Sequence, residues 1–430
     1  MPLTGYCSEK PLAEGLFLRL EFPMLRTLFH TLLGKTQWKR HVVRPVHQFD
    51  ELMLSDLLNG GAEDHRAGLL ESAELKYRAA LEHNPDDAAA MHLMGTLLLQ
   101  RRDYDGAETL VRESLVRLPD SPHVLNSLGT VLSATGRHSE ARQCLDRALQ
   151  HAPGEYKPFA NLLFLMNLIP GVSRSELFDL HRKWAGLHGT RPPEQHIVRK
   201  LQNRNAPTSG GRRLRIGYVS ADFCAHPVGR IMCGVLQNHD RAAFHVTCYD
   251  NGSVHDEIWH QCAASADVWR DVSGQLNDSL AELIGNDGIQ VLVDLSGHTR
   301  KNRLGAFAYR PAPVQLTWLG YLNTTGMQSI DWRLTDSVMD PMPYAPRWHT
   351  ENILYLPDCI WPCQPIPELQ VSSPPFRRTG RITFGSVNTF RKLNSAVFVV
   401  WARILNAIPD AQLAICLLYT SPSPRDQRGS

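Results

Sequence analysis

The sequence predicts two architectures in one chain: a stack of paired α-helices, then an α/β region with a parallel, doubly wound sheet. Three observations support this. Small and apolar residues recur every 34 residues in the first half of the chain, and the stretch from Asn203 to Gly211 has no periodicity. From Leu214 onward, short β-branched runs alternate with helical stretches, as in parallel sheets. A chain of 430 residues is long enough for more than one domain.

The repeat appears as four columns in one register. Positions 34 residues apart hold Ala73, Ala107 and Ala141; Leu81, Leu115 and Leu149; Pro85, Pro119 and Pro153; and Gly95 and Gly129. Ala and Gly let two helix backbones approach closely. Pro lacks an N–H and has a fixed φ, so it ends one helix and precedes the next. We therefore expect one helix pair per repeat, with turn and N-cap residues around each Pro.

These spacings resemble the tetratricopeptide repeat, with about two full repeats and flanking halves inside residues 61–170. The resemblance implies a right-handed array whose concave face binds peptides or proteins. The alternative is that so few repeats only brace the next domain. Residues 1–60 show no repeat. Residues 171–212 hold one more amphipathic helix, begun by a capping box of Ser173 and Glu176, and then a linker.

Strands and helices alternate in the second domain, residues 213–370. The runs at Leu214–Ser220 and Phe244–Tyr249 read as strands, and the near-continuous apolar run Ile289–Leu295 as a strand buried on both faces. Ser279–Ile284 reads as a helix between them. In such a sheet, ligands bind at the carboxyl ends of the strands.

Composition excludes several classes of protein. Lys and Arg number 45 against 43 Asp and Glu, and a net charge of +2 predicts no general attraction to nucleic acid or anionic membrane. The nine cysteines form no CxxC pair, which favours reduced thiols in the cytoplasm. The apolar stretch that starts at Gly15 is interrupted by charges and is too short for a membrane span.

Four stretches carry a family resemblance. They are Arg215-Ile-Gly-Tyr-Val-Ser-Ala-Asp-Phe-Cys-Ala-His-Pro, Asp294-Leu-Ser-Gly-His-Thr, Arg310-Pro-Ala-Pro-Val-Gln-Leu-Thr-Trp-Leu-Gly-Tyr and Phe384-Gly-Ser-Val-Asn-Thr-Phe-Arg-Lys-Leu. Together, from about residue 214 to 415, they resemble the catalytic region of bacterial-type protein O-GlcNAc transferases with N-terminal tetratricopeptide repeats.

The resemblance implies two Rossmann-like lobes of the GT-B type, with a UDP-sugar bound mainly by the second. It also implies inverting transfer of N-acetylglucosamine (GlcNAc) from UDP-GlcNAc to Ser or Thr hydroxyls of proteins, with no metal or other cofactor. The residues agree with a metal-free reaction, because no carboxylate pair stands at a strand end of the second domain. Asp103 and Asp105 fall in a turn between helices and are interpreted as turn residues.

His226 corresponds to the active-site histidine of this family. It follows the strand Leu214–Ser220 and a loop, and Pro227 fixes the chain after it. A neutral imidazole could accept the proton of the acceptor hydroxyl, or it could orient sugar and peptide. A structural histidine, hydrogen-bonded within its loop, is the alternative.

The remaining candidate residues are substrate-binding. By resemblance, Lys392 contacts the diphosphate and stabilises charge on the departing UDP. Asn388 and Thr389, with the following helix N-terminus, are expected to add donors to the same phosphates.

Two further loops are expected to line the cleft. Thr324 and Thr325 follow Gly320-Tyr321, although Leu-Asn replaces the family's Pro-Gly before them. Gly297 and His298 end the apolar strand Ile289–Leu295.

Acceptor proteins are the expected partners, together with UDP-GlcNAc. The animal enzymes line the concave face of their repeats with an asparagine ladder. Here the equivalent positions hold Leu93, Ser127 and Asn161, so the ladder is largely missing. Two other functions stay open: a related transferase that uses another nucleotide sugar, as fucosyl-transferring relatives do, and a non-catalytic interaction module.

The end of the chain predicts an incomplete second lobe, residues 371–415. A strand starts at Arg381, a helix covers Ser395–Ala407 and another strand begins at Ala411. Residues 416–430 are rich in Ser, Pro and Arg and have no periodicity. We expect this tail to be non-native or disordered and this chain alone to be an inactive fragment. The apolar residues of the helix should be partly exposed: Phe398, Val399, Trp401, Ile404 and Leu405.

Overall fold

The computed structural model describes residues 46–190, 213–363 and 372–417. The chain divides into two compact units, Met1–Asp56 and Leu57–Ser430. The predicted linker segments Arg191–Pro193 and Asn203–Gly211 and the tail after residue 417 lie outside the described residues.

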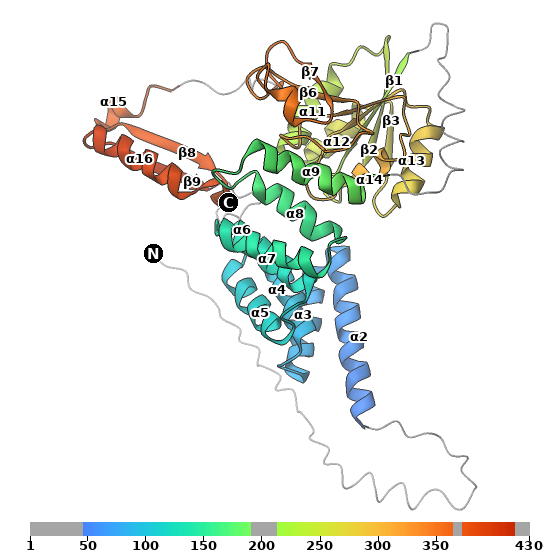
Figure 1. Ribbon diagram of the computed structural model, residues 1–430, viewed down its shortest axis with the longest axis vertical. Coiled ribbons are helices and arrows are strands. Elements are labelled where there is room, and N and C mark those ends of the chain that lie inside the picture. Colours follow the sequence, from blue (N-terminus) through green and yellow to red (C-terminus); the bar gives the residue numbers. More distant parts are fainter. Residues whose placement is uncertain (1–45, 191–212, 364–371, 418–430) are drawn as a thin grey trace, which may run out of the picture. The chain divides into compact units, whose positions relative to one another are not determined.

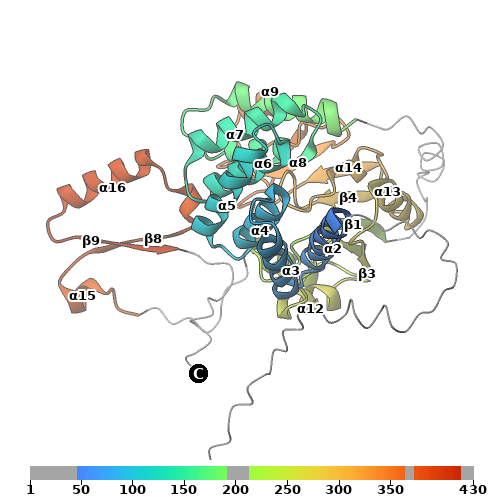
Figure 2. The ribbon, with the colours of Figure 1, turned by 90° about the horizontal axis from the view of Figure 1, so that it is seen from below.

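Paired antiparallel helices make up the first half of the second unit (Figure 1). In chain order they are the C-terminal part of α2 (Val46–Ala67), α3 (Leu70–His83), α4 (Ala88–Gln100), α5 (Tyr104–Arg117), α6 (Pro122–Ala134), α7 (His138–His151), α8 (Tyr156–Met166) and α9 (Arg174–His188). Figure 2 shows them stacked in sequence order.

The repeat register predicted from sequence is confirmed. Ala73, Ala107 and Ala141 each occupy the fourth position of α3, α5 and α7, and all three are fully buried. A Cβ added at Gly95 would lie 2.7 Å from the Val111 side chain, and one at Gly129 would lie 2.9 Å from Leu145. Small residues are therefore required where the two helices of a pair cross.

Side-chain caps begin several of these helices, as the turn residues predict. Asp87 accepts a hydrogen bond from the backbone N–H of Ala90, and Ser121 from that of Val124. Asp103 caps α5 in the same way, which agrees with its interpretation as a turn residue. Ser173 accepts from the Glu176 N–H at 3.1 Å and begins α9. Each cap satisfies an N–H that the helix itself cannot pair.

Helix pairing extends beyond the columns seen in the sequence. A Cβ at Gly61 in α2 would lie 2.6 Å from the ring of Tyr77 in α3, so this pair crosses as closely as the others. Gly61 lies 34 residues before Gly95, in the same column. At the other end α9 packs against α8.

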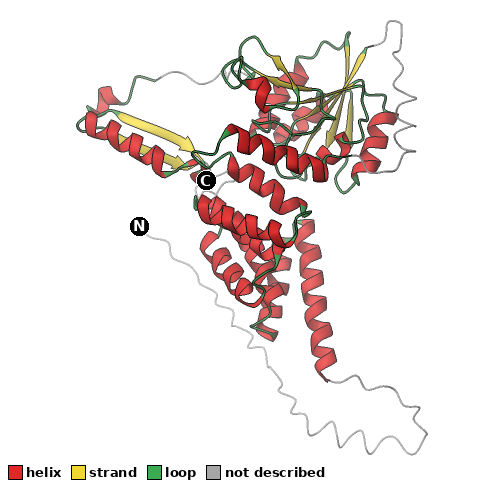
Figure 3. Ribbon diagram, viewed as in Figure 1, coloured by secondary structure: helices red, strands yellow, loops and turns green. Residues whose placement is uncertain are grey.

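A seven-stranded, all-parallel sheet forms the second half, with strand order β3-β2-β1-β4-β5-β6-β7 (Figure 3). The strands are β1 (Leu214–Ser220), β2 (Phe244–Asp250), β3 (Val268–Asp271), β4 (Val291–Asp294), β5 (Val314–Thr317), β6 (Trp332–Thr335) and β7 (Asn352–Tyr355). The predicted parallel α/β sheet is confirmed. Four short strands, β3, β5, β6 and β7, have too few residues to give a periodic signal.

Helices cover both faces of this sheet. One face packs on α11 (Pro227–Gln237) and α12 (Glu257–Ala264), and the other on α13 (Asn277–Asn286) and α14 (Leu304–Phe307). The second face also receives the repeat array: Phe159 of α8 and Trp184 of α9 belong to one buried cluster with Val219 and Leu292 of the sheet. The repeats therefore pack directly on the second domain.

The last described segment contains two parallel strands, β8 (Thr383–Asn388) and β9 (Gln412–Leu417). Three helical elements accompany them: α15 (Phe376–Thr379), the 3-10 turn η2 (Phe390–Lys392) and α16 (Ser395–Ala407). The predicted helix matches α16, and β9 runs two residues past the predicted end of the lobe, through Leu417. In α16, Phe398, Val399 and Ile404 are exposed and Trp401 and Leu405 half-buried, as predicted.

No helix among the described residues is long and apolar enough to cross a membrane.

Candidate active site

The strand order reverses direction between β1 and β4, which lie side by side in the middle of the sheet. β1 leads outward to β2, and β4 leads outward to β5 on the other side. At such a switch point the two following loops diverge and leave a crevice at the carboxyl edge. The loops here are residues 221–226 after β1 and 295–303 after β4.

His226 lies at this switch point, as the sequence predicts. It is the N-cap of α11: its Nδ1 accepts a hydrogen bond from the Val228 N–H at 3.3 Å. Its side chain is 42% exposed, and Nε2 has no hydrogen-bond partner among the described residues. The ring is thus held by one nitrogen and presents the other outward.

Two carboxylates, which sequence reasoning missed, hold the loop before His226. Asp256, the N-cap of α12, accepts hydrogen bonds from the Ala225 N–H at 2.7 Å and the Trp259 N–H at 3.1 Å. Asp222 Oδ2 lies 3.9 Å from His226 Nδ1. Burial raises the pKa of the Asp222 carboxyl, and the nearby His226, Lys301 and Arg300 oppose that shift.

The loop after β4 brings cations to the same crevice. Lys301 donates from Nζ to Ser253 Oγ at 2.9 Å, and its carbonyl accepts from Asn251 Nδ2 at 2.9 Å. The loops after β2 and β4 are therefore tied together. Arg300 is exposed on the same loop. This edge of the sheet brings together an imidazole, a carboxylate and two cations, a set suited to an anionic or sugar-bearing ligand.

Gly297 and His298 are both buried, contrary to the expectation that they line the cleft. Gly297 has φ +53°, and a Cβ there would lie 2.3 Å from the Tyr321 Cβ. His298 is 2% exposed, its Nε2 lies 2.8 Å from the Thr325 carbonyl, and burial lowers the pKa of its ring well below the usual value. Asp294, which holds the Gly297 N–H at 2.8 Å, is also buried, and burial raises its pKa to about 6.

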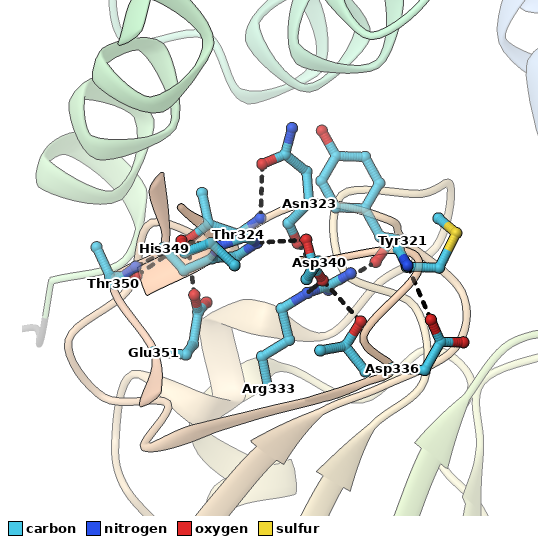
Figure 4. Close-up of polar contacts among 12 residues, drawn as sticks. Tyr321, Asn323, Thr324, Arg333, Asp336, Asp340, His349, Thr350 and Glu351 are labelled. Atoms are coloured by element: carbon cyan, nitrogen blue, oxygen red, sulfur yellow. Dashed lines mark hydrogen bonds and ion pairs between the residues drawn. The ribbon is translucent and has the colours of Figure 1, made fainter. Parts of the chain in front are cut away.

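Thr324 and Thr325 are likewise fully buried, contrary to the expectation of a cleft position. Thr324 Oγ1 donates to Glu351 Oε2 at 2.6 Å, and both the N–H and the hydroxyl of Thr325 donate to Glu351 Oε1 (Figure 4). Their hydroxyls are used to bind a buried carboxylate, so this structure gives them a role in holding the loop. A following glycine, Gly326, takes φ +77°.

A buried arginine supports the same loop from below. Arg333 in β6 is 1% exposed and donates from Nη1 to the carbonyls of Tyr321 and Asn323, each at 3.0 Å. Its Nε donates to Asp340 Oδ2 at 3.1 Å (Figure 4). A buried charge needs such full pairing, since an unpaired one costs several kcal/mol.

The candidate phosphate-binding residues form a separate group after β8. Asn388 ends β8, and its Oδ1 accepts from the Thr389 N–H at 2.9 Å. Lys392 ends η2 and is exposed, and its N–H donates to the Thr389 carbonyl. Lys392 therefore lies between a strand and a helix, as predicted. Within the described ranges no hydrogen bond or ion pair joins this group to His226.

Comparison with known proteins identifies the family to which this arrangement is similar. The family model for glycosyl transferase family 41 matches residues 195–363, and tetratricopeptide repeat models match 65–128 and 98–163. A solved O-GlcNAc transferase mutant from Thermobaculum terrenum is 33% identical with a TM-score of 0.77, over 85% of this chain and 68% of that one. The chain belongs to glycosyl transferase family 41.

Curated relatives of this family 41 chain agree. A probable UDP-N-acetylglucosamine–peptide N-acetylglucosaminyltransferase, SPINDLY from Arabidopsis thaliana, is 37% identical over 59% of the chain. The UDP-N-acetylglucosamine–peptide N-acetylglucosaminyltransferase of Caenorhabditis elegans is 37% identical over 34%. The chain spans 28% and 13% of the length of these two relatives.

The family 41 chain also contains functional candidates that its motifs did not reveal. Asp256 and Glu351 lie outside the four recognised stretches and act through contacts distant in sequence. Asp222 stands inside one of those stretches, four residues before His226, and that spacing was the available signal. Among the described residues no cluster of three or more His, Cys, Asp or Glu could hold a metal ion.

Proposed function

We propose that this protein transfers GlcNAc from UDP-GlcNAc to Ser or Thr hydroxyls of acceptor proteins. The observation that carries the proposal is a half-exposed His226 at the switch point of a family 41 sheet, with a ring nitrogen, Nε2, that has no hydrogen-bond partner among the described residues. The printed names of the relatives, which act on UDP-GlcNAc and peptides, support the donor and the acceptor class.

The reaction is a displacement at the anomeric carbon. The acceptor hydroxyl oxygen bonds to C1 of GlcNAc, the bond from C1 to the diphosphate oxygen breaks, and UDP leaves with the bonding pair. The hydroxyl proton passes to an oxygen of the departing diphosphate or to solvent water, so no protein base is needed. We assign Lys392 to the negative charge that builds on the diphosphate, because a cation there acts mainly in the transition state. Asn388 and Thr389 stand next to it and supply polar groups for the same phosphates.

The cap contact of His226 favours an orienting role over a basic one. Because Nδ1 accepts from the Val228 N–H, the proton of the neutral ring sits on Nε2, which then donates. A basic Nε2 would need the other tautomer, with Nδ1–H directed at Asp222 3.9 Å away and the cap lost. We therefore assign His226 to binding an oxygen of the sugar or acceptor.

The repeat array is the proposed route for acceptor proteins. Its facing helices are joined by polar pairs: His92 with Ser127 at 2.8 Å, and Asn161 with Asn126 at 2.8 Å. Asn161, the one expected ladder residue, therefore uses its amide Nδ2 in a hydrogen bond to the neighbouring repeat. We propose that acceptor proteins bind to the surface of the array and not to an asparagine ladder.

A transfer assay on the full-length gene product tests the proposal. With UDP-GlcNAc and a Ser/Thr peptide library, mass spectrometry should detect addition of one N-acetylhexosamine, and UDP-activated or GDP-activated alternative sugars should serve poorly. Transfer of another sugar instead would support a related transferase. Absence of any transfer, with peptide binding to the repeats intact, would support a non-catalytic interaction module.

Three substitutions separate the two roles of His226. His226→Asn can keep the cap and His226→Gln can keep an outward N–H, while neither is basic near pH 7. Both should transfer sugar faster than His226→Ala if His226 orients an oxygen. Equal loss in all three variants would assign it to proton removal.

A further inference from the structure

Helix α8 carries polar side chains at both of its ends, and each reaches a different loop of the sheet's carboxyl edge. Tyr156, its first residue, donates from its hydroxyl to Asn302 Oδ1 at 2.7 Å, in the loop after β4. Asn167, its C-cap, donates to the Tyr321 hydroxyl at 2.8 Å, in the loop after β5. One helix of the repeat array therefore contacts both loops.

The contact at Tyr321 has a single consistent direction. His181 Nδ1 lies 2.6 Å from the Leu177 carbonyl, which can only accept, so Nδ1 carries the proton and Nε2 offers a lone pair. The Tyr321 hydroxyl, 2.8 Å from Nε2, must donate to it, and its oxygen then accepts from Asn167. The chain Asn167–Tyr321–His181 thus joins α8, the loop and α9 with every polar group satisfied.

The same loop is fixed on its other side. Asn323 donates from Nδ2 to Asn167 Oδ1 at 3.0 Å, while the carbonyls of Tyr321 and Asn323 accept from buried Arg333. In Figure 4 the side chains of Tyr321 and Asn323 point away from the strands, opposite to Arg333. The loop is held between the repeat array and the sheet.

Tyr321 also reaches the loop that borders His226. Its Cβ leaves no room for a side chain at Gly297, and its ring lies 5.2 Å from that of His298. This loop continues to Lys301, which is hydrogen-bonded to Ser253 in the loop after β2. Contacts therefore run from the repeats through Tyr321 to the loop after β4 at the switch point.

We infer that Tyr156, Asn167, His181 and Tyr321 are positioning residues that couple the repeat array to the loop after β4, which borders the active site, and to the loop after β5, which packs against it. The repeats are then part of the catalytic scaffold in addition to any acceptor binding. The effect on transfer kinetics rests on the proposed function. The effect on the mobility of the loops rests on the geometry alone. Loss of the Tyr321 hydroxyl should loosen both loops without opening the apolar core around them.

Tyr321→Phe and Asn167→Ala test this against a matched control, Tyr77→Phe. Tyr77 in α3 is also buried and also hydrogen-bonds a histidine, His65 Nδ1 at 3.5 Å, but it packs in a cluster of repeat residues that contains no residue of these loops. Hydrogen exchange in residues 295–303 and 318–328 should accelerate about tenfold in the first two variants, as expected for one lost buried hydrogen bond, and stay unchanged in the control.

Transfer kinetics supply the second readout. The kcat/KM for acceptor should fall about tenfold in Tyr321→Phe, with the KM for UDP-GlcNAc unchanged, and the double variant with Asn167→Ala should add little because both lose one contact. Loops that exchange alike in Tyr321→Phe and Tyr77→Phe would overturn the coupling. Looser loops with unaltered kcat/KM in the full-length gene product would overturn the positioning role. A full-length gene product that transfers no sugar would instead contradict the proposed function and leave the exchange result to decide the coupling.

Discussion

Acidification from pH 7 to pH 5 should destabilise this protein through histidines that it buries in neutral form. Burial lowers the pKa of His181 to about 4 and that of His92 to about 4, from an ordinary value of 6.5. In the unfolded chain both rings take up a proton as the pH falls below 6.5, while the folded protein resists until about pH 4. The unfolded state thus binds more protons in this window, and stability falls with pH.

The size of the effect follows from the two pKa values. Each histidine removes about 2 kcal/mol of unfolding free energy between pH 7 and pH 5. Asp294 acts in the opposite direction: its pKa of about 6 in the fold exceeds the ordinary 3.8, so it gains stability as pH falls through 6. That gain is about 1 kcal/mol at pH 5, and the net loss is about 3 kcal/mol. The apparent melting temperature should fall by about 3–5 °C, because the unfolding entropy of a chain this long is large.

Thermal unfolding of wild type and His181→Gln at pH 7 and pH 5 checks this. Glutamine does not titrate, so the drop between the two pH values should shrink by about 2 kcal/mol in the variant, whatever its stability at pH 7. The control is His83→Gln, because His83 is exposed at the end of α3. A pH-independent melting temperature in wild type, or the same drop in His181→Gln, would refute the reasoning.

Three further outcomes are expected. His226→Ala should lower transfer by about 10²-fold, as expected for a lost orienting contact, and should cost about 1 kcal/mol of stability because the N-cap of α11 is lost; a preserved rate would make His226 a helix cap only. Lys392→Ala should impair kcat more than Lys392→Arg, because one lost transition-state contact is worth roughly 3–4 kcal/mol. EDTA should have no effect on transfer; inhibition by EDTA, with activity restored by a divalent metal, would contradict the mechanism. Gly129→Ala should destabilise the array by about 1–3 kcal/mol in a denaturant titration because its Cβ would meet Leu145, whereas Gly154→Ala, with open space around it, should be neutral; equal effects would disprove the close helix crossing.

Sequence periodicity predicts the helix repeats and the longer strands of the fold. The alanine and glycine columns follow directly from helix crossing, so the spacing of Ala73, Ala107 and Ala141 is enough to place them at equivalent helix positions. The near-continuous apolar run Ile289–Leu295, which contains β4, is equally clear. β5, β6 and β7 were not found, because four residues are too few to show a period and their pairing is decided by neighbours far along the chain.

Motifs located His226 and Lys392 but not the burial of the other candidates. Thr324, Thr325 and His298 carry the polar atoms expected of cleft residues, and sequence position alone cannot tell whether those atoms face a crevice or a partner. The threonine hydroxyls bind Glu351, 26 residues after Thr325, and the His298 ring binds the Thr325 carbonyl. These contacts turn the polar atoms away from a cleft. Sequence by itself determined the order of domains, the repeat and the residue at the switch point. Only the tertiary structure decided which polar groups stay free, because a buried hydroxyl or imidazole is satisfied by whatever the fold brings within hydrogen-bond distance.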